Sequence, residues 1–186
     1  MIQWLPSIKE SSFLKRLLYA VIGIWSYPGV NIINRVRVKG MDQLHTLPRE
    51  KVLFVSNHQT YFADVITILH IFCAVKWGKK KKLGIPYYLL WPFTHVKYVA
   101  AEETMKRNWV SRLFTLAGAI TVRRTWNAGN NEKRKGLDPG DTRKITRALE
   151  TNWVITFPQG TTKPFAPGRK GTAFIKIGRA SCRERV

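Results

Sequence analysis

Cysteine is scarce in this chain of 186 residues, which contains only Cys73 and Cys182. Two cysteines do not make a disulfide framework, so the sequence favours a reducing, cytosolic setting over that of a small secreted domain. Cys73 lies in the apolar run HIFCAV and is expected to be a small core residue rather than a nucleophile.

Acidic residues are also few, with 11 Asp and Glu against 32 Lys and Arg, which gives a net charge of +21. This excess predicts a polyanionic partner, such as an anionic membrane, a nucleic acid or a phosphorylated cofactor. The chain lacks zinc-finger spacing, basic-region heptads and an RNA-binding aromatic signature, so nucleic acid is not the expected partner. Seven Trp, nine Phe and six Tyr beside this charge favour a membrane interface. No metal is expected, because His45, His70 and His95 form no ligand spacing with carboxylates.

The apolar run over residues 13–27 is short for a membrane span. As a helix it would measure about 22 Å, against roughly 30 Å for the hydrocarbon core. Pro28-Gly29 is expected to stop it, and no small-x-small cleavage site marks a signal peptide. We expect residues 1–34 to form an interfacial or re-entrant anchor on the cytoplasmic face of the cell membrane. A helix buried against the domain is the alternative.

The rest of the chain alternates short apolar runs with helical spacing, which predicts an α/β domain with a mostly parallel sheet flanked by helices. An edge strand over 35–39 is expected before Gly40, and a mobile loop over 127–140. The expected core strands are 52–55, 96–100, 120–122 and 153–157, and the expected helices are 65–75, 102–116 and 142–151, the last capped by Asp141.

Two polar side chains follow the expected strand 52–55. His58 lies just past its end, and Asp64 comes immediately before the next helix. The imidazole can face a crevice while the carboxylate reaches its other ring nitrogen and fixes the tautomer, as in a catalytic pair. A structural histidine and an N-capping aspartate are the alternative.

Two further blocks follow in order: GAITVRR at 118–124 and FPQGTTKPFAPGRKG at 157–171. Together with NHQTYFAD they resemble the glycerolipid acyltransferase family, to which bacterial 1-acylglycerol-3-phosphate acyltransferases belong. The resemblance runs from about residue 36 to residue 174.

The resemblance implies that His58, oriented by Asp64, is a general base for the acceptor's hydroxyl, which attacks a thioester carbonyl. No enzyme nucleophile and no bound cofactor are then required; the acyl donor is acyl-coenzyme A (acyl-CoA) or acyl carrier protein (acyl-ACP). It also implies that Arg124 contacts the acceptor's phosphate. The full set of implied substrate-binding residues is Asn57, Arg124, Phe157, Pro158, Gln159, Gly160, Thr161, Lys163, Arg169 and Lys170.

The chain departs from the family pattern at named positions. Five residues separate His58 from Asp64 instead of four, which would turn a helical side chain by about 100°. Where the family reads FPEGTR, Gln159 replaces the glutamate and Thr162 the arginine, and Lys163 can supply the missing cation. Pro158 and Gly160 could instead serve only to form turns.

Two stretches have open interpretations. Four lysines at 79–82 precede LGIPYYLLWPF at 83–93, which is either solvated surface or a membrane-contacting insertion. From Gly178 the arginine-rich GRASCRERV has no apolar period. We therefore expect an incomplete acyltransferase domain over 35–177, with a non-native tail over 178–186.

These observations predict a membrane-associated acyltransferase that converts lysophosphatidate to phosphatidate. The alternatives are an acyltransferase for another lysolipid or for glycerol-3-phosphate, or a non-catalytic basic protein that binds membranes or nucleic acid. Salt-sensitive binding to DNA would favour the last of these.

Overall fold

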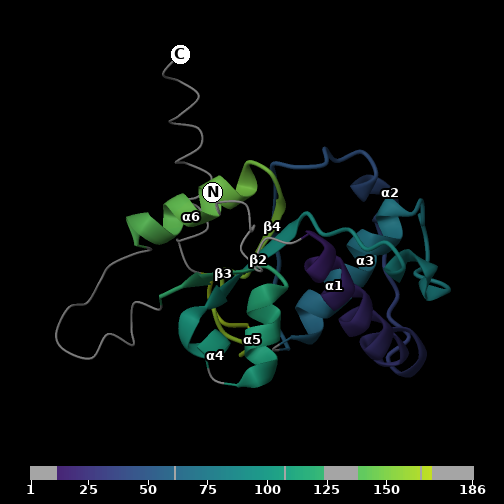
Figure 1. Ribbon diagram of the computed structural model, residues 1–186, viewed down its shortest axis with the longest axis horizontal. Helices are drawn as coiled ribbons and strands as arrows, with labels where there is room; N and C mark the ends of the chain where they lie inside the picture. Colours follow the sequence, from purple (N-terminus) through teal and green to yellow (C-terminus); the bar gives the residue numbers. More distant parts are fainter. Residues whose placement is uncertain (1–11, 61, 107, 124–137, 164, 169–186) are drawn as a thin grey trace, which may run out of the picture. The chain divides into compact units, whose positions relative to one another are not determined.

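The computed structural model describes residues 12–60, 62–106, 108–123, 138–163 and 165–168 (Figure 1). The chain divides into two compact units. One consists of helices and contains residues up to 48 together with 62–94; the other contains residues 49–61 and those from 95 onward, and is built on a sheet. We call them the helical unit and the sheet unit. The expected division at residues 34 and 177 stays a prediction.

The helical unit contains α1 (Ser12–Tyr27), the π-helical η2 (Pro28–Ile33), α2 (Met41–Leu44), α3 (Ala63–Lys76) and the 3₁₀ turn η3 (Pro86–Leu89). The helix predicted over 13–27 is confirmed. The expected stop at Pro28-Gly29 is wrong in part, because the chain continues from Tyr27 into η2. Proline is tolerated there because the first residues of a helix donate no intrahelical hydrogen bond.

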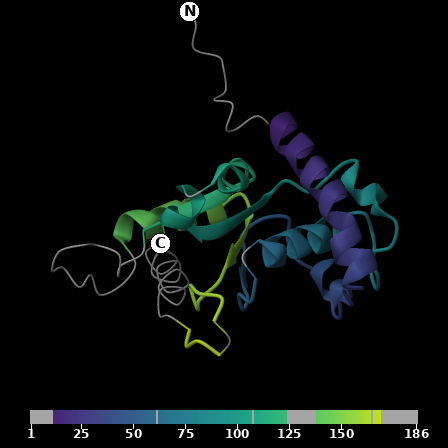
Figure 2. The same ribbon diagram turned by 90° about the horizontal axis from the view of Figure 1, so that it is seen from below.

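Helix α1 packs against α3 and η3 (Figure 2). Gly23 allows this approach, since a Cβ at that position would lie 2.6 Å from Cδ2 of Leu89. Cys73 of α3 is fully buried in this unit, as the sequence predicts, and burial raises the pKa of its thiol to about 12. Such a thiol is a packing residue rather than a nucleophile. Among the described residues, none of the helices has the length and apolar character needed to span a bilayer.

The sheet unit contains β1 (Val52–Val55), β2 (Val96–Ala101), β3 (Ala119–Val122) and β4 (Trp153–Thr156) in the spatial order β1-β4-β2-β3. All three neighbouring pairs are parallel, which confirms the predicted parallel sheet. The carboxyl ends of the four strands therefore lie at one edge of the sheet, where ligands bind in open α/β sheets.

The buried centre of the sheet is β4, whose four residues are all buried. The expectation that residues 52–55 form a buried strand was right about the strand and wrong about its burial. Among the described strands β1 pairs with β4 alone, and Val55 at its end is 58% exposed. The edge strand expected over 35–39 is wrong: Arg35 has φ +45°, outside the extended region, and residues 35–39 pair with no strand of the described sheet.

Helices α4 (Glu102–Lys106), α5 (Trp109–Leu116) and α6 (Pro139–Leu149) complete the sheet unit. The single helix expected over 102–116 is two helices, because Asn108 between them has an extended backbone. The expected cap Asp141 is also wrong, since α6 begins earlier and Oδ1 of Asp138 accepts from Gly140 N at 2.8 Å. Of the loop expected over 127–140, residues 127–137 lie outside the described residues.

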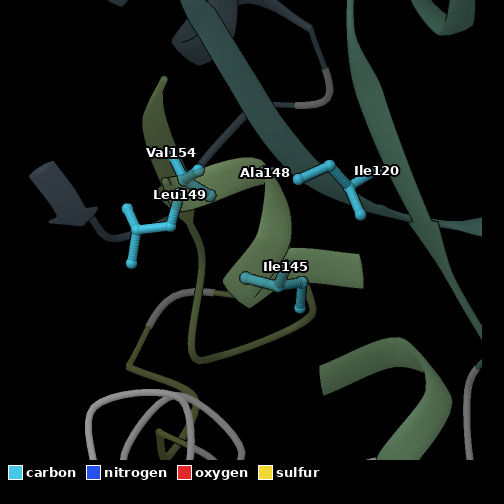
Figure 3. Packing of buried hydrophobic residues seen from close by; sticks show 5 residues of the cluster. All are labelled: Ile120, Ile145, Ala148, Leu149 and Val154. Carbon is cyan, nitrogen blue, oxygen red and sulfur yellow. The ribbon is translucent and has the colours of Figure 1, made fainter. Parts of the chain in front are cut away.

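Helix α6 covers one face of the sheet (Figure 3). Its residues Ile145, Ala148 and Leu149 pack on Ile120 and Val154, which are buried on β3 and β4. Successive strand residues point to opposite faces, and on the other face the Tyr98 hydroxyl donates to Phe114 O in α5 at 2.6 Å. The sheet is thus held by helices on both faces, as expected of an α/β domain.

Candidate functional site

The segments that leave β1 and β4 lie beside each other, although a hundred residues separate them in the sequence. Val55 is in register with Thr156, and Ser56 N donates to Thr156 O at 3.1 Å, so the ladder extends one residue past β1. This pairing brings His58 next to the segment that begins at Phe157. Two of the sequence blocks therefore meet at the carboxyl edge of the sheet.

The imidazole of His58 stacks on the ring of Phe157. The two ring centroids are 4.4 Å apart and the ring planes meet at 28°. Both residues are half-buried. The stack restricts the tilt of the imidazole while leaving part of it open to solvent, which is what a base that receives a proton from a bound hydroxyl requires.

The side-chain amide of Gln159 also joins these two segments, by hydrogen bonds to backbone groups. Its Oε1 accepts from His58 N at 3.1 Å, and its Nε2 donates to Ala166 O, also at 3.1 Å. A turn brings the side chain back, since Gly160 N donates to Phe157 O at 3.1 Å and Gly160 has φ +60°. Glycine adopts this left-handed conformation without strain, so Gly160 forms the turn as its sequence suggests.

The following residues form a second turn. Lys163 N donates to Oγ1 of Thr161 at 3.3 Å, and Ala166 N donates to Lys163 O at 3.4 Å. The Lys163 side chain is exposed, and Phe165 is fully exposed with φ +57°. An exposed ammonium on this loop can meet an anionic substrate.

Asn57 and Asp64 are two further predicted site residues that the structure describes. Asn57 is exposed beside His58. Asp64 is in the first turn of α3 in the helical unit, and the N-cap of α3 is Phe62, so the alternative that Asp64 caps the helix is wrong. Its role in orienting His58 stays a prediction. Arg124, Arg169 and Lys170 lie outside the described residues.

Asp141, which the sequence suggested as a helix cap, instead holds the end of β3. Asp141 is 4% exposed, and its Oδ2 accepts from Arg123 N at 3.0 Å while Oδ1 pairs with Lys144 Nζ at 2.7 Å. The Arg123 side chain is exposed, and its Nε lies 3.3 Å from Oε2 of Glu102. Lys106 first, and then Arg123, hold the pKa of the Glu102 carboxyl below its usual value.

The sequence held a signal for the cap of α6 that our prediction missed. Pro139 indicates Asp138 rather than Asp141 as the cap, because proline is common at the first helical position.

The helical unit exposes an apolar surface. Along α1, Phe13, Leu17, Val21 and Ile24 are each at least half exposed and recur at helical spacing. Other exposed apolar side chains of this unit are Trp25, Ile32, Ile33, Trp77, Ile85, Tyr87, Leu90 and Trp91. We call this set, with the four α1 residues, the apolar surface.

Cations lie on the aromatic rings of the helical unit. The guanidinium of Arg16 is 4.1 Å from the ring centroid of Trp91, and Nζ of Lys79 is 4.4 Å from that of Tyr87. Nζ of Lys76 is 4.8 Å from the ring centroid of Phe93. This combination of aromatic rings and cations is typical of side chains at a membrane–water interface.

The chain was compared with known proteins in three ways. The family model described as Acyltransferase matches residues 35–178, which include all three sequence blocks. The searches of curated proteins and of solved structures returned no significant match.

Proposed function

We propose that this chain, which belongs to the acyltransferase family and is an acyltransferase, moves a fatty acyl group to 1-acyl-sn-glycerol-3-phosphate. The acyl donor is acyl-CoA or acyl-ACP, and the product is phosphatidate. Both donors and the acceptor are anionic, which suits a chain of net charge +21. The observation that carries the proposal is the half-buried imidazole of His58, stacked on Phe157 at the carboxyl edge of the sheet.

In the proposed reaction the His58 imidazole takes the proton from the acceptor's free hydroxyl as its oxygen attacks the thioester carbonyl. The carbon–sulfur bond then breaks, and the imidazolium returns the proton to the leaving thiolate. The acyl group passes directly between substrates, so no covalent enzyme intermediate forms. Asp64 is proposed to hold the imidazole in the tautomer that accepts the proton.

The acceptor's phosphate needs cationic partners. We assign this role to Arg124, Arg169 and Lys170, because a guanidinium fork makes paired hydrogen bonds to phosphate oxygens. Lys163, which precedes Arg169 and Lys170 in the segment after β4, has an exposed side chain, and this supports the assignment. Gln159 and Thr162 replace the family's glutamate and arginine. Because this block binds substrate in the family, another lysolipid or glycerol-3-phosphate is the alternative acceptor.

We further propose that the enzyme acts at the cytoplasmic face of an anionic membrane, where its lipid substrate lysophosphatidate resides. The apolar surface would enter the interface while the cations of the helical unit contact lipid headgroups. The exposed stripe of α1 favours this arrangement over burial of the stripe against the domain. No bound cofactor, metal or nucleic acid is part of the proposal.

The test is thiol release from acyl-CoA, with and without lysophosphatidate, for the unaltered chain and for His58→Ala. Release that needs both the acceptor and His58 is expected. His95→Ala is the matched control, because His95 is an exposed histidine just before β2, at the opposite edge of the sheet. Acceptor-dependent release that survives His58→Ala would contradict the assigned base. Release only with glycerol-3-phosphate or another lysolipid would transfer the proposal to that acceptor.

A further inference from the structure

Gln159 uses both ends of its amide within the protein. The carbonyl oxygen accepts from the backbone N–H of His58, and the amino group donates to the backbone carbonyl of Ala166. Reversing the amide would set donor against donor and acceptor against acceptor, so its orientation follows from its partners. A glutamate could make the first hydrogen bond but, when ionised, has no proton for the second.

The two hydrogen bonds join the segment that follows β1 to the second turn of the loop after β4. His58 is then held twice by one short segment, through its ring by Phe157 and through its backbone by Gln159. At the other end, Ala166 follows Phe165, whose φ of +57° is strained for a side chain with a Cβ. Such a conformation persists only where surrounding contacts hold it, and the bond from Gln159 to Ala166 O is one of them.

We infer that Gln159 is a positioning residue that sets His58 and the loop carrying Lys163 in fixed relation, rather than a group that contacts substrate. This inference rests on the proposed function for its effect on catalysis, but the hydrogen bonds themselves can be tested without activity. The replacement of the family's glutamate has a consequence here: the link between the two segments carries no charge, so it does not change with pH in the working range. It also keeps a carboxylate away from the base.

The first test measures amide hydrogen exchange and does not depend on activity. Gln159→Met keeps the length of the side chain and removes both hydrogen bonds. Amide hydrogen exchange at His58 is then expected to become faster by roughly fivefold, the factor that corresponds to a net hydrogen bond of about 1 kcal/mol. Exchange within β4 should stay unchanged, which shows that the variant is folded. Unchanged exchange at His58 would overturn the inference, whether or not the protein transfers acyl groups.

The second test measures the steady-state kinetics of acyl transfer. In Gln159→Met, kcat is expected to fall by roughly tenfold, because small misplacements of a catalytic group are costly. In Gln159→Glu, kcat also falls, and the acid limb of the pH–rate profile moves to higher pH, because the new carboxylate stabilises the protonated form of the nearby base. A rise in the KM for the acceptor, with kcat and the pH profile unchanged in both variants, would overturn the inference and make Gln159 a substrate contact. Loss of activity in the unaltered chain would contradict the proposed function, while the exchange test would still decide the inference.

Discussion

The hydroxyl of Ser26 on α1 lies 2.9 Å from Nε2 of His70 on α3. The same hydroxyl is 2.7 Å from Ile22 O, to which it donates its single proton, so Nε2 of His70 is the donor in the first contact. Nδ1 then accepts from the Tyr88 hydroxyl of η3 at 3.0 Å. One neutral tautomer of a fully buried imidazole thus connects three elements of the helical unit, and its burial lowers the pKa of His70 to about 4.

The stability of the helical unit should therefore depend on pH. The pKa of His70 is about 4 in the folded chain and near the ordinary histidine value of 6.5 in the unfolded chain, so the unfolded chain binds more protons between these values. Stability is expected to be highest above pH 6.5 and to fall toward pH 4, by up to about 3 kcal/mol. Urea denaturation of the unaltered chain and of His70→Gln across this range measures the effect. An equal loss of stability in both would contradict it.

Phe157 should control activity through its stack on His58. Phe157→Leu keeps an apolar side chain just after β4 but removes the ring, and kcat is expected to fall by roughly twofold to tenfold, the range that corresponds to an aromatic pair worth about 0.5–1.5 kcal/mol. Phe157→Tyr keeps the ring and is the matched control. Steady-state acyl transfer measures both variants. A kcat for the leucine variant equal to that of the tyrosine variant would show that the stack does not position the base.

The local pattern of the sequence predicted most elements of this fold, and its failures have physical causes. The runs 52–55 and 153–157 look alike as sequence, yet β4 is buried at the centre and β1 is an edge strand, because their burial depends on pairings between residues a hundred positions apart. Residues 35–39 alternate as a strand would, but Arg35 has a backbone that does not continue one. The partners of Gln159 were likewise beyond local reasoning, since His58 and Ala166 become neighbours only after the sheet has formed.

Membrane binding should depend on the apolar surface. Trp25 is 82% exposed on α1, and Trp25→Ala is expected to weaken binding to vesicles containing phosphatidylglycerol by roughly 10- to 100-fold, since the lost burial of the aromatic ring is worth about 1.5–3 kcal/mol. The control is Trp109→Ala, because Trp109 is a similarly exposed tryptophan on α5 of the sheet unit. Sedimentation with vesicles measures both. Equal weakening by the two substitutions would contradict the proposed surface.

The lysine run should supply the preference for anionic lipid. Lys80 and Lys81 are exposed between α3 and η3, and each basic residue near an anionic surface contributes about 1 kcal/mol. Replacing both with glutamine is expected to weaken binding to vesicles with phosphatidylglycerol by roughly 30-fold and to leave binding to neutral phosphatidylcholine unchanged. High salt should abolish most of the difference between the two vesicles. An equal effect on neutral vesicles would assign the lysines to folding rather than to lipid contact.

Asp141 should stabilise the sheet unit and, through it, the proposed acceptor site. In Asp141→Ala the Arg123 N–H loses the carboxylate that it contacts at 3.0 Å, and the free energy of unfolding is expected to fall by about 1.5–3 kcal/mol, the net contribution of a hydrogen bond to a charged group. Because Arg124 directly follows Arg123, the KM for lysophosphatidate is expected to rise as well.

Lys144→Ala separates the two contacts of the Asp141 carboxylate. It removes only the exposed ammonium 2.7 Å from Oδ1 and leaves the hydrogen bond to Arg123 N in place, so stability should fall by less than it does in Asp141→Ala. Its KM for lysophosphatidate should equal that of the unaltered chain. If Lys144→Ala raised KM as much as Asp141→Ala, the surface ion pair rather than the backbone of β3 would control the acceptor site. Urea denaturation and steady-state kinetics on the two variants decide between these mechanisms.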